Sequence, residues 1–204
     1  MQLLVPGSPN RSICVFCGSN PGVNPAYSEA AQALGAAMAD ANLRLVYGGG
    51  NVGLMGILAD SVMHAGGSVV GVIPRFLANK ELAHPGLTEL HEVETMHERK
   101  SLMMKLSDAF VALPGGIGTL EEFFEVWTWA QLGLIQKPIG LLNIENLFDP
   151  MLQFLDSLVQ QRFMKPIHHD LLVVASRPRE LLTQLWQRDT PSEDKWLERA
   201  AGKI

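Results

Sequence analysis

The most informative stretch of this chain is Ala109-Phe110-Val111-Ala112-Leu113-Pro114-Gly115-Gly116-Ile117-Gly118-Thr119-Leu120-Glu121-Glu122. Its apolar start, 109–113, predicts a buried strand, and the segment Thr119–Leu132 predicts a helix. In a strand followed by a glycine-rich turn and a helix, backbone N–H groups and the positive end of the helix dipole converge at the start of the helix. This arrangement favours the binding of a phosphate there. Two carboxylates lie beside this turn. A phosphate site next to carboxylates indicates an enzyme that acts on a phosphorylated sugar or nucleotide.

Strand and helix patterns alternate on both sides of this stretch. The predicted strands are Ser12–Cys17, Leu43–Tyr47, Ser68–Ile73, Glu89–Val93, Ala109–Leu113, Ile139–Leu142 and Leu171–Ala175. The predicted helices are Ala26–Asn42, Leu54–Ala65, Met96–Ser107, Thr119–Leu132, Phe148–Gln160 and Pro178–Gln187. The strands are short and apolar throughout, which is typical of a parallel sheet buried on both faces. We therefore expect an α/β fold whose ligand lies at the carboxyl ends of the strands, where both glycine-rich segments fall.

Length and composition favour one globular domain. The chain has 204 residues, of which 47% are hydrophobic and 18% are charged, a balance that allows a filled core. We expect an N-terminal extension over 1–11, a domain over 12–188 and a polar C-terminal tail over 189–204. The formal net charge of -5 argues against a general nucleic-acid binder.

The sequence favours a cytoplasmic protein without a membrane partner. No apolar run reaches the roughly 18 residues that a membrane span needs. The first residues, Met1–Asn10, lack the basic patch and apolar core of a secretory signal.

The cysteines and histidines do not indicate a metal or redox site. Cys14 and Cys17 lie three apart on a predicted strand, so their side chains point to opposite faces. A redox CxxC normally opens a helix, and no second cysteine pair completes a zinc site. The histidines show no HExxH spacing; they are His64, His84, His91, His97, His168 and His169. We expect no bound metal ion.

The second glycine-rich segment, Gly48–Gly56, contains a GxGxxG pattern between a predicted strand and a predicted helix. Dinucleotide-binding enzymes carry this pattern after their first strand, with an acidic residue at the end of the next one. Here the pattern follows the second strand, and the next strand ends at Ile73-Pro74-Arg75. The dinucleotide interpretation is weakened. Two others stay open beside it: a tight turn that packs a helix on the sheet, and glycines that line a mononucleotide site.

Charged residues at the start of the predicted helix Met96–Ser107 are a third candidate. Thr95 and Glu98 have the spacing of a capping box. Arg99 and Lys100 then lie in the early turns, where the helix dipole disfavours cations. Residues placed against a local preference often serve function, so Arg99 is expected to face a phosphate or ribose beside the glycine turn. A solvated helix face is the alternative.

Glu122 also has two interpretations. With Thr119 it has the T-x-x-E spacing of a capping box, so it could serve only to cap the helix. That role does not explain Gly115, Gly116 and Gly118, which leave the strand end bare so that a ligand can approach the backbone.

Several motifs, in order, make the chain resemble the LOG (Lonely Guy) family. The central one is Pro114–Glu122, which fits the family's PGGxGTxxE motif. The others are Cys14-Val15-Phe16-Cys17-Gly18-Ser19, Tyr47-Gly48-Gly49-Gly50, Gly53-Leu54-Met55-Gly56, Gly71-Val72-Ile73-Pro74, Met96-His97-Glu98-Arg99-Lys100 and Thr128-Trp129-Ala130-Gln131-Leu132-Gly133. The resemblance implies a Rossmann-like, doubly wound parallel sheet with helices on both faces, in a single domain.

The resemblance also implies a function and a set of site residues. The function is hydrolysis of the N-glycosidic bond of AMP-like nucleoside 5'-monophosphates, with or without an N6 modification, by a homodimer that needs no cofactor. By position, Arg99 and Glu122 match the family's catalytic pair. The substrate-binding positions are Glu81, Arg99, Lys100, Gly115, Gly116, Ile117, Gly118, Thr119, Leu120, Glu121 and Thr128. Members were long labelled lysine decarboxylases, yet no lysine here is convincingly placed to form a Schiff base with pyridoxal phosphate.

The residues agree with this chemistry. Cleavage develops positive charge on the ribose carbon and ring oxygen, which a carboxylate can stabilise. Glu122 is our choice for that role, with Glu121 as a ribose contact and Arg99 assisting the leaving base or orienting Glu122. The preferred base is left open among adenine, an N6-prenylated adenine and another purine. The alternative function is a non-catalytic nucleotide or molybdenum-cofactor carrier on the same fold.

Two tryptophans bear on assembly. Trp127 and Trp129 lie two residues apart on a predicted helix, so they point about 200° away from each other. One can pack on the sheet, and a partner subunit is expected to cover the other, because aromatic residues are enriched in interface cores.

Overall fold

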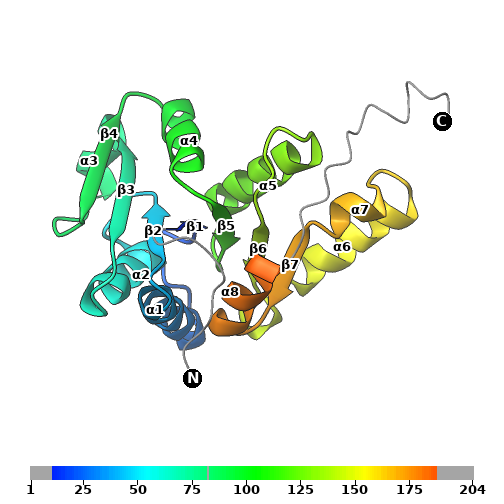
Figure 1. Cartoon of the computed structure of the whole chain (residues 1–204), viewed down its shortest axis with the longest axis horizontal. Coiled ribbons are helices and arrows are strands. Elements are labelled where there is room, and N and C mark those ends of the chain that lie inside the picture. The colour runs from blue at the N-terminus through cyan, green and yellow to red at the C-terminus, as the bar shows by residue number, and fades with distance from the viewer. Residues whose placement is uncertain (1–10, 82, 188–204) are drawn as a thin grey trace.

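The computed structural model describes residues 11–81 and 83–187 (Figure 1). The strands are β1 (Ser12–Phe16), β2 (Arg44–Tyr47), β3 (Val69–Pro74), β4 (Glu89–Val93), β5 (Ala109–Ala112), β6 (Ile139–Leu142) and β7 (Leu172–Ala175). The helices are α1 (Pro25–Asp40), α2 (Gly53–His64), α3 (Arg75–Glu81), α4 (Met96–Lys105), α5 (Ile117–Gln131), α6 (Asp149–Gln160), α7 (Pro166–His169) and α8 (Pro178–Gln187), with a 3-10 helix η1 (Ile144–Asn146). Apart from Arg11, the extension expected over 1–11 and the tail expected over 189–204 lie outside the described residues.

The strands form one parallel sheet in the order β4-β3-β2-β1-β5-β6-β7. This order confirms the predicted α/β, Rossmann-like, doubly wound fold. The predicted strands and helices are all present, with bounds that differ by one or two residues where they differ. Three elements were not predicted, namely α3, α7 and η1. They have 7, 4 and 3 residues, too few to show a helical period in the sequence.

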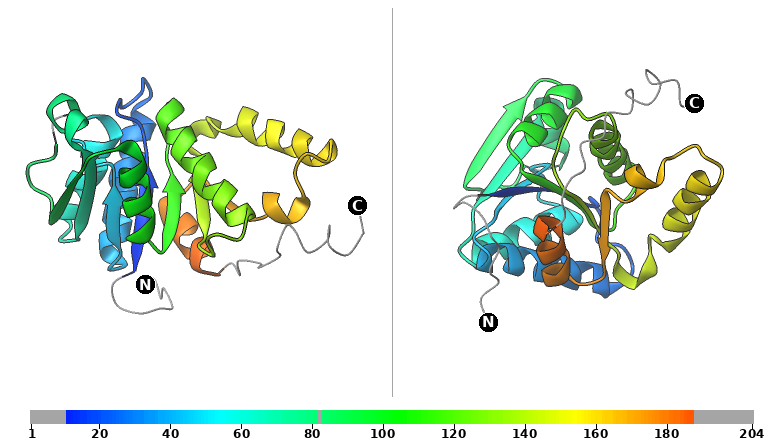
Figure 2. Two further views of the ribbon diagram at one scale, coloured as in Figure 1. Left: turned by 90° about the horizontal axis from the view of Figure 1, so that it is seen from above. Right: turned by 45° about the vertical axis from the view of Figure 1, so that its right-hand side comes forward.

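Helices cover both faces of the sheet. α1, α2 and α8 pack on one face, and α4, α5 and α6 pack on the other (Figures 1 and 2). Side chains alternate between the two cores along β1: Ile13 and Val15 belong to the first core, and Phe16 belongs to the second. Because both faces are covered, the strands are apolar throughout. In the described part of the chain, no helix combines the length and the apolar surface that a bilayer crossing requires.

The two cysteines lie on opposite faces of the sheet, as predicted. Cys14 is part of the core under α5, and Cys17 is part of the core under α1 and α2. Both thiols are buried and free. Burial, more than any nearby charge, raises the pKa of each thiol well above its usual range, so both stay protonated at neutral pH. The CxxC pattern is therefore a packing feature of β1.

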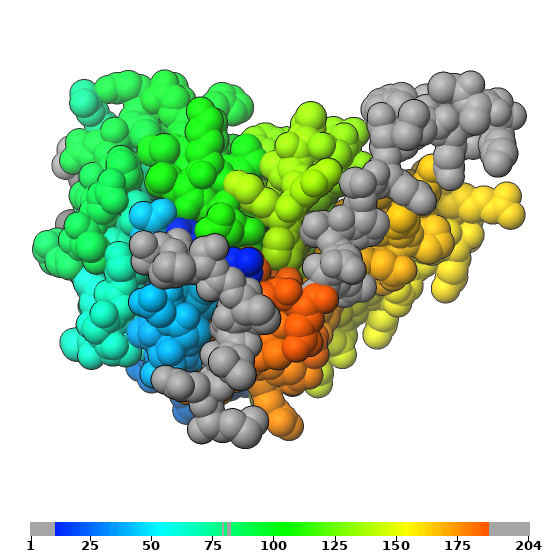
Figure 3. Space-filling view, viewed as in Figure 1, coloured from blue at the N-terminus to red at the C-terminus, as the bar shows by residue number. Residues whose placement is uncertain are grey.

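The direction of winding changes between β1 and β5. From β1 the chain builds outward to β4 on one side, then returns to form β5 against the other side of β1. Beyond these strands, the N–H of Gly18 donates to the carbonyl oxygen of Pro114 at 3.0 Å, so the two following loops touch. Doubly wound sheets bind ligands at such a point. Figure 3 shows the surfaces of α4 and α5 as neighbouring green and yellow-green areas on the upper side of the molecule.

Candidate active site

The glycine turn after β5 leaves the start of α5 open. α5 begins at Ile117 and has Gly116 as its N-cap, so no side chain caps its first turn. The first N–H groups of a helix have no partner within the helix. Here they lie at the carboxyl end of β5, beside the loop that follows β1. This arrangement can bind a phosphate or another anion.

The interpretation of Glu122 as a cap for Thr119 is wrong. α5 starts two residues before Thr119, which therefore lies within the first turn and is buried. At α4 the predicted cap is present on one side, where Thr95 Oγ1 accepts a hydrogen bond from the N–H of Glu98 at 3.1 Å. The carboxylate of Glu98 accepts from the N–H of Glu94 rather than of Thr95, so the reciprocal bond of a capping box is shifted by one residue. The T-x-x-E spacing thus marks the start of α4 at Thr95 but does not mark the start of α5 at Thr119.

The glycines of the turn have two different uses. A Cβ on Gly115 would lie 2.1 Å from Thr119 Oγ1 and 2.8 Å from the nitrogen of Gly18, so a side chain there would collide with the turn. A Cβ on Gly116 or Gly118 would meet no atom within 4 Å. Gly115 therefore allows close packing of the two loops, whereas Gly116 and Gly118 leave open space over the start of α5.

Arg99 and Glu122 form a nearly buried ion pair beside this turn. Nη1 of Arg99 lies 3.3 Å from Oε1 of Glu122, and the two side chains are 10% and 11% exposed. Arg99 Nε donates to the carbonyl oxygen of Val72 at 3.2 Å, which fixes the guanidinium against the end of β3. The solvated-face interpretation of Arg99 is therefore wrong. The cap at Thr95 sets where α4 begins and so directs Arg99 inward.

Gly48 provides the space for Arg99. A Cβ on Gly48 would lie 2.0 Å from Nη2 of Arg99, and the Gly48 carbonyl oxygen accepts from that nitrogen at 3.5 Å. Further along the same segment, Gly53 has φ +57°, and a Cβ there would collide with the backbone of Ser19. In the segment Gly48–Gly56, the first glycine thus makes room for Arg99, and a later one allows close packing against the loop after β1.

The carboxyl group of Glu122 has an unusual environment. Its pKa is raised by burial, an effect that the charge of Arg99 opposes and that of Glu121 reinforces. Within the described residues, Oε1 has no hydrogen-bond partner, although Arg99 is close enough for an ion pair. A buried carboxyl group with a raised pKa and a free oxygen can orient a hydroxyl group or water, or exchange a proton.

These residues share one cavity of about 270 Å³. Its walls are the first turn of α5, the end of β1, the Arg99–Glu122 pair, Gly48, and the side chains of Met55 and Met96. A second cavity of about 320 Å³ shares Gly18, Ser19 and Gly116 with it. Together they reach the size of small-molecule sites, roughly 300–1,000 Å³. Met55 and Met96 belong to quoted motifs, but the sequence analysis assigned them no role.

Lys100 lies next to the cavity and bridges two carboxylates. Its Nζ is 2.6 Å from Glu121 Oε1 and 3.1 Å from a carboxylate oxygen of Glu125. Burial lowers the pKa of Lys100, but hydrogen bonds to Glu121 and Glu125 outweigh it and raise the pKa overall. The sequence analysis did not name Glu125. Its position four residues after Glu121, on the same helix face, was the signal that could have found it.

Thr128 and Leu120 are predicted site residues that do not line the cavity. Thr128 lies on the exposed side of α5, where its hydroxyl donates to the carbonyl oxygen of Phe124 at 2.7 Å. Glu81 ends α3, and its side chain lies outside the described part of the structure. Leu120 packs against the core under α5, and Ile117 is exposed. The described residues contain no group of three or more His, Cys, Asp or Glu side chains that could hold a metal ion.

Sequence comparisons give close relatives. A family model described as "Possible lysine decarboxylase" matches residues 55–185. The chain is 51% identical over 165 residues to a cytokinin riboside 5'-monophosphate phosphoribohydrolase of Rhodococcoides fascians, covering 80% of this chain and 83% of the relative. It is 47% identical over 175 residues to one of Arabidopsis thaliana (86% and 81%). It is 46% identical over 185 residues to a probable one of Oryza sativa subsp. japonica (91% and 74%).

Solved structures share the fold at lower identity. A molybdenum cofactor carrier protein from Chlamydomonas reinhardtii matches with a TM-score of 0.64 and 21% identity, covering 87% of this chain and 97% of that one. A molybdenum cofactor binding protein from Rippkaea orientalis matches with a TM-score of 0.63 and 23% identity, covering 87% and 96%. At these identities the likeness concerns the fold alone.

Proposed function

The chain belongs to the family of possible lysine decarboxylases that includes the cytokinin riboside 5'-monophosphate phosphoribohydrolases, and we propose that it hydrolyses the N-glycosidic bond of AMP-like nucleoside 5'-monophosphates. The products are the free base and ribose 5-phosphate. One observation carries the proposal: the buried pair of Arg99 and Glu122 lines the same cavity as the uncapped start of α5. The preferred base, including an N6-prenylated adenine, stays open.

The phosphate binds at the glycine turn. Backbone N–H groups from Gly116 to Thr119 point toward the cavity end of α5, where the helix dipole favours an anion. The missing side chains of Gly116 and Gly118 give the phosphate room. Binding the phosphate fixes the sugar relative to the Arg99–Glu122 pair, and such remote binding lowers the barrier by positioning.

Glu122 acts on the sugar. Cleavage of the glycosidic bond places positive charge on the ribose carbon and ring oxygen, and a nearby carboxylate stabilises it. Oε1 of Glu122, which is ion-paired with Arg99 but makes no hydrogen bond among the described residues, can accept one from the attacking water or from a ribose hydroxyl. Glu121, which is more exposed, supplies a second ribose contact.

Arg99 holds Glu122 and meets the leaving base. Its guanidinium is fixed by the carbonyl oxygens of Val72 and Gly48 and by Glu122. Such a group is always protonated, so it can orient the carboxylate and stabilise negative charge on the departing purine.

The name lysine decarboxylase fits this cavity poorly. A lysine that forms a Schiff base needs a lowered pKa so that its amine is free to attack. Lys100, the lysine beside the cavity, has a raised pKa and is paired with Glu121 and Glu125. The carrier alternative rests on a shared fold, and the Arg99–Glu122 pair favours hydrolysis over it.

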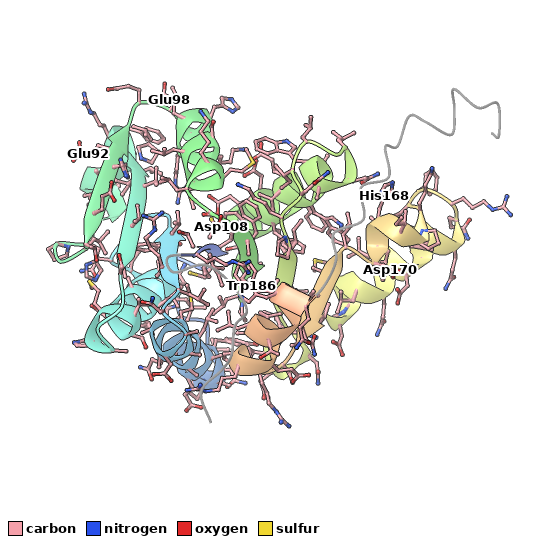
Figure 4. All side chains as sticks on the ribbon, viewed as in Figure 1. Glu92, Glu98, Asp108, His168, Asp170 and Trp186 are labelled. Atoms are coloured by element: carbon pink, nitrogen blue, oxygen red, sulfur yellow. The ribbon has the colours of Figure 1, made fainter. Side chains whose placement is uncertain are left out.

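A homodimer through α5 is part of the proposal. Trp127 is buried against the sheet and donates its Nε1 hydrogen to the carbonyl oxygen of His168 at 2.9 Å. Figure 4 labels His168 beside α6. Trp129 is only partly buried, and Ile117 and Phe124 on the same helix are exposed. A second copy is the expected cover for the exposed Ile117 and Phe124, and Trp129, the less buried of the two tryptophans, is the expected interface tryptophan. The cytoplasmic location stays a prediction.

Incubation with AMP tests the proposed reaction. The purified chain is expected to release adenine and ribose 5-phosphate in equal amounts, as seen by chromatography, without added metal ion or cofactor. The matched control is Glu122→Gln under the same conditions. A chain that binds AMP but returns it intact, alone and with N6-prenylated AMP, would favour the carrier alternative.

A further inference from the structure

Lys100 is held by two carboxylates that follow one another on α5. Glu121 and Glu125 are four residues apart, so their side chains lie on one helix face. Both contact the same Nζ, at 2.6 Å and 3.1 Å. The family resemblance implies substrate-binding positions at Glu121 and Lys100 but gives no role to Glu125.

The two carboxylates differ in their surroundings. The side chain of Glu121 is 52% exposed and lines the main cavity, where a ribose can reach it. The side chain of Glu125 is 25% exposed and does not line that cavity. Glu125 instead lines a small hollow of about 10 Å³ together with Lys100 and Glu122. Such a hollow holds at most about one water molecule, so Glu125 is close to Lys100 and Glu122 with little solvent between them.

We propose that Glu125 is a positioning residue that keeps Lys100 beside Glu122 while Glu121 leaves Lys100 to contact the ribose. This inference rests on the proposed hydrolysis. Glu121 contacts Lys100 through Oε1, so turning this carboxylate toward a sugar hydroxyl would lengthen that contact. Glu125 is less exposed and does not line the main cavity, so its contact with Lys100 is kept when Glu121 turns to the ribose.

The charges around Glu122 explain why the position of Lys100 matters. Arg99 and Lys100 approach it from α4, and Glu121 and Glu125 from α5. The nearby thiols, Cys14 on β1 and Cys17 just after it, lie on opposite faces of the sheet and are uncharged at neutral pH. Lys100 lowers the pKa of Glu122, whereas Glu121 and Glu125 raise it. If Lys100 moved outward with Glu121, Glu122 would lose a cation and its pKa would rise further.

Glu125→Ala and Glu125→Gln separate positioning from charge. Both variants remove the carboxylate charge, but the glutamine oxygen can still accept a hydrogen bond from Lys100. We expect Glu125→Ala to lower kcat/KM for AMP about tenfold, a typical effect for groups in contact, and to move the acidic limb of its pH profile to higher pH. Glu125→Gln should retain most of the activity, and the acidic limb of its pH profile should not move to higher pH. The phosphate of AMP titrates in the same way with every variant. A difference between the pH profiles of two variants therefore comes from the protein.

A double-mutant cycle gives a second readout. If Glu125 acts through Lys100, then adding Glu125→Ala to Lys100→Met should lower kcat/KM for AMP by far less than about tenfold. Inhibition by ribose 5-phosphate should be unchanged in Glu125→Ala, because Glu125 does not line the phosphate site. Glu29→Ala, an exposed glutamate on α1, is the control substitution, and thermal melting checks that each variant is folded.

The inference is overturned if Glu125→Ala has wild-type kcat/KM, if its acidic limb stays in place or moves to lower pH, or if its cost is undiminished in Lys100→Met. Each of these results requires an active wild-type enzyme. A wild type that does not cleave AMP or its N6-prenylated form would instead contradict the proposed function itself.

Discussion

The guanidinium of Arg99 lies in space that Gly48 leaves free, and a single methyl group at position 48 would fill that space. A Cβ at position 48 would lie 2.0 Å from Nη2 of Arg99, far inside van der Waals contact. The guanidinium would have to move, and with it the partner of Glu122. The glycine is therefore required by a side chain that is distant in sequence, in addition to any need for an open cavity.

Gly48→Ala should impair catalysis more than stability. Overpacking of this kind typically costs about 1–3 kcal/mol of folding free energy, and a misplacement of about 1 Å in a catalytic group can cost about 100-fold in rate. We expect kcat for AMP to fall by about that factor in a folded protein. Gly86→Ala is the control, because a Cβ there makes only ordinary contact, 3.8 Å from His84. Equal activity of the two variants would show that Arg99 can be displaced without consequence.

Glu122→Gln should bind the nucleotide but turn it over at least about 100-fold more slowly, a common lower size for loss of a general acid–base group. The amide keeps the volume of the side chain, so the fold should persist. Single-turnover kinetics and equilibrium binding of AMP measure the two effects separately. Near-normal release of adenine by this variant would remove Glu122 from the catalytic role.

The pKa of Glu122 should lie above the ordinary glutamate value of about 4.3, because burial raises it more than Arg99 lowers it. The ionised carboxylate is the form that stabilises positive charge, so activity should be lost as the pH falls through this raised pKa and not return at lower pH. Carboxyl-selective NMR, with Glu122→Gln to assign the signal, measures the value directly. An ordinary or lowered pKa would contradict the buried environment.

Adenosine should be a much poorer substrate than AMP. Without a 5'-phosphate, the start of α5 has no anion to bind, and the sugar loses its positioning. We expect kcat/KM to differ by at least about 100-fold, within the range for remote binding groups. Addition of ribose 5-phosphate should inhibit AMP cleavage, since it offers the same phosphate. Comparable values for the two substrates would mean that the glycine turn has another use.

Trp129→Glu should yield a folded monomer, and Trp127→Glu an unfolded protein. Trp127 is 3% exposed and packs in the core, where loss of a large aromatic side chain costs about 3–5 kcal/mol. Trp129 is only partly covered in the single chain. Light scattering and circular dichroism distinguish the cases. A wild type that is an active monomer of 22.3 kDa at micromolar concentration would refute the dimer.

Local patterns were enough to predict most of the fold. The apolar strands, the helical spacing and the cap at Thr95 are all properties of neighbouring residues, and each appears in the structure. The short helices α3 and α7 have too few residues for a period to emerge. The pattern at Thr119 misled for a different reason: α5 starts earlier than that spacing suggests, and Glu122 is drawn toward Arg99 on another helix.

Contacts between distant elements could not be read from local patterns. The residues around Gly48 do not predict its contact with Arg99, and those around Glu125 do not predict its contact with Lys100. Each pair is far apart in the sequence and comes together only when the chain folds. The family resemblance pointed to Arg99, Lys100 and Glu121, whereas the bridge to Glu125 emerged from the three-dimensional arrangement alone.

The place of β1 next to β5 also sets when the site can exist during folding. Ser12 N donates to Asp108 (labelled in Figure 4), 96 residues away, and this central pairing joins the two halves of the sheet. Such distant pairing is slow compared with helix formation, because a long loop must close first. The loops around the cavity lie on both sides of that seam. Recovery of hydrolysis after denaturation therefore reports on the slow joining of the halves, while recovery of helical signal can precede it.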